Sequence, residues 1–345
     1  MVKDGTVLST SAFTRATSIS GQPLTGLVDA RRLLALVDQG ATVVLQGLHR
    51  SWPRITELVA QLETELGHPG QANAYLTPAG SQGFAPHRDT HDVFVIQTEG
   101  EKVWLIGEEG SEDEVLLTPG SVLYLPTGTR HSARSQASHS LHVTVGINQV
   151  TWRGLVERAV RQALAAIPDT HLPAGYLEDP DALAEGLRAH LDAVSAAVAD
   201  LDPAVLARAH VEHLLTSRPP RLAGGLADAI RAGSSAAPAA PAASGAESGG
   251  ECSADPSPPA RITDDTVLTR RPTNPGHLVE GPPGTVRLLL GDRRMDAPDW
   301  LRPALVDLLA REQFTPRDLA DLLDPQSRLV LCRRLVREGL FMVGP

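Results

Sequence analysis

Hydrophobic and polar positions follow two different periods along the chain. Residues 27–38 and 53–66 carry apolar side chains three and four positions apart, which predicts two helices, and residues 41–48 between them predict a buried strand. From residue 72 to residue 148, short apolar or alternating runs are separated by turns rich in Gly and Pro. The runs are NAYLT, VFVIQT, KVWLI, VLLT, SVLYLP and SLHVTVGI. This spacing predicts a sandwich or barrel of antiparallel strands.

The period changes back to a helical one after this β-rich stretch. Residues 153–166, 181–199 and 203–216 each show apolar side chains three and four positions apart. Residues 233–260 consist mainly of Ala, Pro, Ser and Gly, with almost nothing to bury, and predict a disordered linker. The pattern therefore predicts a barrel over residues 1–150, a helical region over 151–232, this linker, and a further domain over 261–345.

The last domain mixes strands and helices. We expect a strand at VRLLL, helices at about 299–311, 316–323 and 326–338, and a final strand at LFMV. Thr315 and Pro316 are suited to the N-cap and to the first helical position of the middle helix. This order of elements is typical of a winged helix.

Composition narrows the classes of function. The 345 residues carry a formal net charge of −10, and residues 261–345 contain 13 Arg against 12 Asp plus Glu, so direct nucleic-acid binding is not expected. No apolar run is long enough for a membrane helix, and the N-terminus lacks the pattern of a secretory signal, so we expect a cytoplasmic protein. Cys252 and Cys332 form neither a disulfide framework nor a zinc pattern.

The segment 86–92, PHRDTHD, contains two side chains that are suited to binding a metal. His87 and Asp89 are two residues apart, so in an extended strand both point to the same side. A third ligand is expected from residues 120–131, GSVLYLPTGTRH, where a strand and a turn precede His131. Two imidazoles and one carboxylate form the facial triad of non-heme Fe(II) oxygenases, which leaves coordination positions open. His87, Asp89 and His131 are therefore the predicted metal ligands and catalytic residues.

Four neighbouring side chains compete with this triad. For His139 and His142, which flank or lie in the strand SLHVTVGI, a core or supporting role is preferred over metal ligation. His91 is a third competing histidine. Asp92 begins an apolar strand and is expected to be a cap or turn residue.

The stretch NAYLTPAGSQGFAPHRDTHDVFVIQTEGEKVW, followed by GSVLYLPTGTRHSA and HSLHVTVGI, resembles the JmjC-type ribosomal oxygenases. The resemblance is close over residues 40–150 and looser through the helical region and the C-terminal domain. It implies a mainly β core, a double-stranded β-helix (cupin) barrel, followed by an α-helical dimerisation region and a winged-helix-like α/β domain. It also implies an Fe(II)- and 2-oxoglutarate-dependent hydroxylase of protein side chains, with a ribosomal protein as a candidate substrate.

The same resemblance assigns roles to individual residues. His87, Asp89 and His131 would hold the iron, and Lys102 would pair with the distal carboxylate of 2-oxoglutarate. Lys3 and Lys102 are the only lysines among 31 basic residues, so a lysine here calls for a specific reason. Further cosubstrate-pocket residues implied by the resemblance are Asn73, Tyr75 and Thr144.

The sequence departs from the family pattern in two places, and it leaves other functions open. Gly146 stands where the family often has a small hydroxyl residue, and the loop 107–119 is shorter than usual. One alternative is a metal cupin that acts on a small molecule without 2-oxoglutarate, and another is a non-catalytic dimeric binding module. The substrate, the oxidised atom, and the choice between hydroxylation and demethylation do not follow from the sequence.

Overall fold

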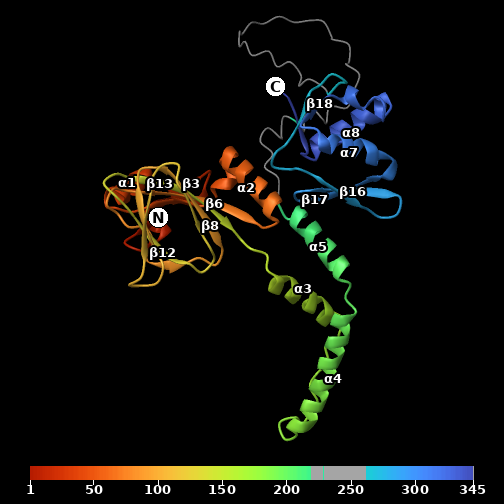
Figure 1. Ribbon diagram of the computed structural model, residues 1–345, viewed down its shortest axis with the longest axis horizontal. Helices are drawn as coiled ribbons and strands as arrows, with labels where there is room; N and C mark the ends of the chain where they lie inside the picture. Colours follow the sequence, from red (N-terminus) through yellow and green to blue (C-terminus); the bar gives the residue numbers. More distant parts are fainter. Residues whose placement is uncertain (219–227, 229–261, 345) are drawn as a thin grey trace, which may run out of the picture. The chain divides into compact units, whose positions relative to one another are not determined.

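The structure is a computed structural model that describes residues 1–218, 228 and 262–344 (Figure 1). The predicted linker, residues 233–260, lies outside these described residues. Contacts between Cα atoms divide the chain into two compact units, Met1–Leu206 and Ala207–Pro345. The finer four-part division expected from the sequence stays a prediction.

The first unit opens with small elements that precede its main sheets. They are β1 (Val2–Lys3), β2 (Thr6–Val7), η1 (Thr10–Ala12), β3 (Thr14–Ile19), β4 (Gln22–Val28), α1 (Ala30–Asp38), β5 (Val43–Leu45), η2 (Leu48–Arg50) and α2 (Pro53–Leu66). Helix α2 begins with Pro at its first position and ends before Gly67, whose φ of 68° suits a residue without a side chain. The predicted helix over residues 27–38 starts later than expected, because residues 27 and 28 belong to β4.

Two antiparallel sheets form the rest of this β-rich core. Their strands are β6 (Gly70–Thr77), β7 (His87–Arg88), β8 (Asp92–Glu99), β9 (Lys102–Ile106), β10 (Asp113–Leu117), β11 (Val122–Leu125), β12 (Arg130–Ser135) and β13 (Ser140–Ile147). One sheet has the order β11-β8-β13-β6-β5 and the other the order β10-β9-β12-β7. All six predicted strand runs are confirmed, and the antiparallel pairing is confirmed as well.

Side chains along β13 point alternately to the two faces of the larger sheet. Val143, Val145 and Ile147 pack in an apolar cluster with Val59 of α2. His142 and Thr144, which alternate with these residues along the strand, line a cavity on the opposite face. Because side chains of a strand point alternately to its two faces, one β-strand supports the helix and supplies the cavity wall.

Three helices follow the sheets: α3 (Trp152–Ala165), α4 (Pro180–Ala199) and α5 (Pro203–Thr216). They match the predicted helices within one residue at each end. Helix α4 has no buried residue, and Leu187 and Leu191 are exposed by 57% and 58%. Among the described residues, no helix combines the length and apolar character of a membrane span.

The second unit is an α/β segment with two three-stranded sheets, β18-β14-β19 and β15-β16-β17. Its single apolar core includes Leu305, Leu335 and Phe341. The elements are β14 (Leu268–Arg270), β15 (His277–Glu280), β16 (Thr285–Leu290), β17 (Arg293–Pro298), η3 (Asp299–Leu301), α7 (Arg302–Ala310), β18 (Gln313–Phe314), η4 (Pro316–Leu319), α8 (Pro325–Arg337) and β19 (Phe341–Val343). The expected helix over 316–323 is only a short 3₁₀ helix, and the winged-helix assignment stays a prediction.

Candidate metal centre and adjoining cavity

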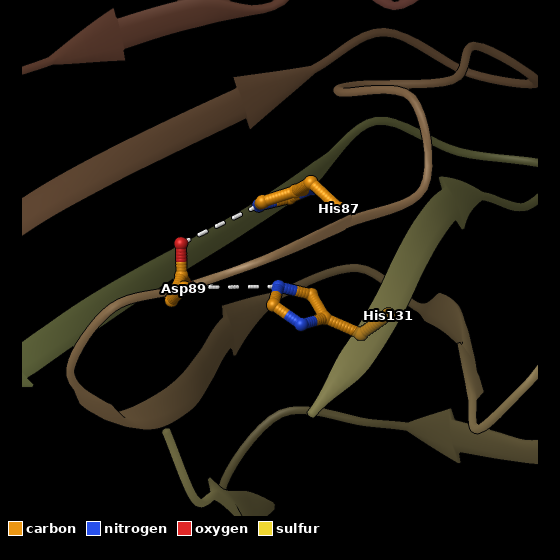
Figure 2. Close-up of side chains that lie close together, drawn as sticks. All are labelled: His87, Asp89 and His131. Atoms are coloured by element: carbon orange, nitrogen blue, oxygen red, sulfur yellow. Dashed lines mark ion pairs between the residues drawn. The ribbon is translucent and has the colours of Figure 1, made fainter. Parts of the chain in front are cut away.

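Three of the predicted site residues meet at one point between neighbouring strands. His87 on β7 is the register partner of His131 on β12, and their ring centroids are 4.4 Å apart. Asp89 follows β7, and its two carboxylate oxygens lie 3.6 Å from the Nε2 atoms of the two histidines. Figure 2 shows the three side chains pointing toward one another. One ligand atom from each lies within 4.8 Å of the others, which is a spacing that one metal ion could bridge.

Backbone carbonyls orient both imidazoles. Nδ1 of His87 lies 2.9 Å from the carbonyl oxygen of Ala85, and Nδ1 of His131 lies 2.9 Å from that of Thr129. A carbonyl only accepts hydrogen bonds, so each Nδ1 carries the proton and each Nε2 keeps a free lone pair. Burial lowers the pKa of His131 and favours its neutral form. The Nδ1 hydrogen bonds therefore fix the orientation of both rings and leave Nε2 of each free to bind a metal ion.

A cavity of about 250 Å³ adjoins the triad and is lined from both sheets. The larger sheet contributes two register pairs whose members both line this cavity, Asn73 with Thr144 and Tyr75 with His142. The predicted site residues therefore lie around one cavity. The triad, Lys102, Asn73, Tyr75 and Thr144 all line it.

Lys102 is the buried cation of this cavity. Its residue is 2% exposed, and Nζ donates to Oγ1 of Thr77 at 2.9 Å. Burial lowers the pKa of Lys102 from 10.5 to about 8, so the side chain is still mainly charged at pH 7. Within the described residues no carboxylate lies at ion-pair distance from Nζ. An unbalanced, desolvated ammonium facing a cavity is a site for an anion that enters from outside.

The other polar side chains of the cavity form a connected group. Tyr75 hydrogen-bonds with Thr144 and Asn73, while burial raises the pKa of its phenol, which stays protonated at neutral pH. Oδ1 of Asn73 accepts from the backbone N–H of Gly47 at 2.9 Å, which fixes that amide. The cavity wall around Tyr75 is therefore uncharged and well oriented, as a ligand-binding surface requires.

His142 is buried and does not belong to the metal cluster. Its ring stacks on that of Tyr75 with centroids 4.9 Å apart and lies edge-on to Trp104 at 5.5 Å. Burial and the nearby charge of Lys102 lower the pKa of His142 well below its usual value. Nδ1 of His142 and Nε1 of Trp104 have no hydrogen-bond partner within the described residues, so both remain available to a bound ligand.

The remaining competitors also lie outside the metal cluster. His139 is on the surface, where its Nε2 lies 2.8 Å from Glu99, so the expected core or supporting role is wrong for this histidine. Asp92 accepts hydrogen bonds from Tyr124 and Thr127 at 2.7 Å and anchors the turn after β11, as expected for a turn residue.

The structure explains why a residue without a side chain stands at position 146. A Cβ atom at this position would lie 2.6 Å from Cδ2 of His91, closer than real side chains approach. The ring of His91 thus occupies the space beside Gly146, and its Nε2 lies 3.4 Å from the side-chain amide nitrogen of Gln71. His91 and Gln71 both line the cavity. Sequence analysis missed Gln71 and Thr77, although their two-residue spacing from Asn73 and Tyr75 places them on the same strand face.

Known proteins match the part of the chain that contains this site. The family model for the JmjC domain matches residues 46–155. The bifunctional lysine-specific demethylase and histidyl-hydroxylase NO66 of Caenorhabditis elegans is 35% identical over 156 residues, which cover 36% of this chain and 21% of the relative. Ribosomal oxygenase 1 of Rattus norvegicus is 36% identical over 137 residues, which cover 33% of this chain and 23% of the relative.

The matched stretch therefore spans less than a quarter of either relative's own length. Among solved structures, the Escherichia coli ribosomal oxygenase YcfD aligns with 95% of this chain and 85% of its own, at 18% identity and a TM-score of 0.48. The match to the family model covers the segment that contains the triad and Lys102. Residues 46–155 thus match a JmjC domain, and this part of the chain is related to the ribosomal oxygenases.

Proposed function

We propose that this chain is an Fe(II)- and 2-oxoglutarate-dependent dioxygenase that hydroxylates a protein or peptide side chain. The observation that carries the proposal is the cluster of His87, Asp89 and His131 on the wall of a cavity that also contains Lys102. The cluster supplies a metal site, and Lys102 supplies a buried cation without a carboxylate partner in the described part of the chain. A dicarboxylate cosubstrate would answer both needs.

The donor atoms fit Fe(II). Two neutral imidazoles and one carboxylate are borderline and hard ligands, and three ligands on one side leave positions for a cosubstrate and for O2. His87 and His131 would bind through Nε2, because the carbonyl oxygens of Ala85 and Thr129 accept from their Nδ1 atoms. Asp89 is the anionic ligand of this set.

The cavity fits 2-oxoglutarate. Lys102 would neutralise the distal carboxylate, and the hydroxyl of Thr77, already bonded to Nζ, would hold the ammonium in place. Asn73, Tyr75 and Thr144 would orient the rest of the molecule through their side-chain oxygen and nitrogen atoms. With Fe(II) and 2-oxoglutarate bound, O2 would be the oxidant: one of its oxygen atoms would enter a C–H bond of the substrate to give C–OH, and the other would enter 2-oxoglutarate, which would be oxidised to succinate and CO2.

A protein substrate is supported by the relatives, whose names describe a histidyl-hydroxylase and a ribosomal oxygenase. We propose a ribosomal protein as the candidate substrate for this chain as well. We also propose that the chain is a homodimer that pairs through α3, α4 and α5, since Leu187 and Leu191 of α4 are exposed. A monomer by light scattering at micromolar concentration would rule out the dimer.

The substrate can be identified by comparing cells that carry the gene with cells that lack it. Mass spectrometry of both would search for peptides that are one oxygen atom heavier only when the gene is present. The wild-type gene should restore these peptides to the deletion strain, and a His131→Ala gene should not. If no peptide changes and the purified chain consumes no 2-oxoglutarate, the hydroxylase proposal fails.

A further inference from the structure

The arginines of the second unit are almost fully balanced by carboxylates. Of the 12 arginines between residues 262 and 344, nine lie within ion-pair distance of an Asp or Glu. Arg270 is a tenth whose guanidinium is engaged, because it donates to the carbonyl oxygen of Leu309 at 2.6 Å near the end of α7. The two remaining arginines have no anionic or helix-capping partner among the described residues.

Those two arginines lie on one face of α8. Arg333 donates one hydrogen bond of 3.1 Å to the carbonyl oxygen of Ile262, and Arg337 is exposed with no partner within residues 1–218, 228 and 262–344. Because residues four positions apart on a helix are neighbours, the two guanidinium groups lie one turn apart along the same edge. In a unit with nearly equal numbers of acidic and basic groups, two adjacent unbalanced cations are a local feature rather than a consequence of overall charge.

A groove of about 720 Å³ runs beside these arginines, between α8 and the end of β17 with η3. Trp300 and Val330 line it and are exposed by 61% and 57%, so both present apolar surface to the groove. Ala297 and Leu331, which belong to the apolar core, also line the groove. The groove thus combines an apolar surface with arginines at its edge.

We propose that this groove docks a protein segment that presents an apolar side chain flanked by carboxylates about one helical turn apart. Trp300 and Val330 would cover the apolar side chain, and Arg333 and Arg337 would pair with the carboxylates. Trp and Arg are the residue types that contribute most to binding at protein interfaces. A nucleic acid fits less well, because residues 261–345 are nearly neutral and the groove offers apolar contacts that a phosphate backbone cannot use.

The test is the selection of a random peptide library on the immobilised full chain. Recovered sequences are then synthesised with a fluorescent label, and their affinity is measured by anisotropy. We expect recovered peptides to combine Asp or Glu with a large apolar residue. Binding should weaken by about tenfold in Arg333→Glu/Arg337→Glu and by a similar factor in Trp300→Ala. The charge-matched variant Arg31→Glu/Arg188→Glu, changed at exposed arginines of the first unit, should bind like wild type.

Several results would overturn the proposal. They are the recovery of no peptide, the recovery of basic or purely apolar peptides, and acidic peptides whose affinity the groove variants leave unchanged. Recovered sequences that match a stretch of this chain would assign the groove to a second copy or to the chain itself instead. Tighter binding of a single-stranded oligonucleotide at the same residues would assign it to nucleic acid. Thermal unfolding of each variant checks that the second unit is folded.

Discussion

The two units of this chain bury cations under opposite conditions. In the second unit, the guanidinium of Arg271 is buried against the carboxylate of Asp228, and Arg328 is paired with Asp264 at 2.6 Å. In the first unit, Lys102 is equally buried, but within the described residues its ammonium donates to the hydroxyl of Thr77 and has no carboxylate partner. A buried charge without a counter-charge destabilises the folded state, whereas a paired one is at least partly compensated. The first unit therefore keeps an unfavourable charge at a position where an incoming anion could pair with it.

The two units also differ in how continuous their apolar cores are. In the described part of the second unit, 19 buried apolar residues form one cluster, including Leu305 and Phe341. The first unit has two clusters of six and five such residues, one facing α2 and one containing Trp104. Val93, Val95 and Trp104 of the second cluster line the cavity, whereas the first cluster packs on the opposite face of β13. The first unit therefore gives up continuous packing where its candidate site lies.

The largest expected effect concerns the proposed metal ligands of the first unit, His87, Asp89 and His131. His87→Ala or His131→Ala should lower 2-oxoglutarate turnover by more than about 100-fold, because loss of a direct ligand exceeds the effect of losing a residue that supports one. Fe(II) binding, measured by anaerobic titration, should fall in parallel while circular dichroism stays unchanged. His139→Ala is the matched control, since this histidine is on the surface and paired with Glu99. Full activity in a triad variant would remove that residue from the metal site.

A core substitution in the second unit should lower the stability of that unit and leave Fe(II) binding unchanged. Leu305 is fully buried, so Leu305→Ala should lower the free energy of unfolding of this unit by about 2–5 kcal/mol. Val306 is the neighbouring residue on α7 and is 55% exposed, so Val306→Ala should change it by less than about 0.5 kcal/mol. Denaturant titration gives both values. Fe(II) affinity should be unchanged in both variants, and a loss of metal binding in Leu305→Ala would contradict the independence of the two regions.

Replacing the unbalanced cation should separate function from stability. Lys102→Met keeps an unbranched side chain that is only one atom shorter and removes its charge, so 2-oxoglutarate should bind about 30-fold more weakly or worse. The free energy of unfolding should rise by about 1–3 kcal/mol, because a desolvated ammonium with a depressed pKa disfavours folding. Calorimetry measures the first quantity and denaturant titration the second. Lys3→Met, at the other lysine of the chain, should change neither.

The smallest expected effect is a pH dependence. The pKa of Lys102 is about 8 in the folded chain without cosubstrate, so raising the pH from 7 to 9 removes most of its charge. The affinity for 2-oxoglutarate should then fall by about tenfold, because the anion loses its cationic partner. In the unfolded chain the pKa is near 10.5, so between pH 8 and 10.5 the unfolded state holds the extra proton and stability rises with pH. In Lys102→Met both dependences should be reduced, and an unchanged slope would assign them to another group.

Much of the first unit could be predicted because its strands alternate or are continuously apolar. The runs in β6, β8, β9 and β13 fall where expected, and α2 matches its predicted bounds. Strand β12 was not predicted, because its sequence RHSARS has no apolar alternation, and only pairing with β9 and β7 makes it a strand. In the second unit β14, β15, β17 and β18 were not predicted, since short or polar strands carry little local signal.

In the candidate site, too, local sequence patterns predict some features and not others. His87 and Asp89 are close in sequence, and His131 was predicted from the turn before it, so the triad could be proposed from spacing. The burial of Lys102 and the ring of His91 beside Gly146 depend on contacts between distant strands. Such contacts leave no periodic signal in the sequence. The surface position of His139 was missed for the same reason.

Calorimetric titration of 2-oxoglutarate into the full chain under anaerobic conditions distinguishes a 2-oxoglutarate-dependent oxygenase from other metal cupins. We predict saturable binding of one 2-oxoglutarate per chain when Fe(II) is present. Binding should be weaker when the metal is removed, and weaker in Lys102→Met at full metal occupancy. Absence of detectable binding to the metal-loaded wild-type chain would contradict the account and favour a cupin that acts without 2-oxoglutarate.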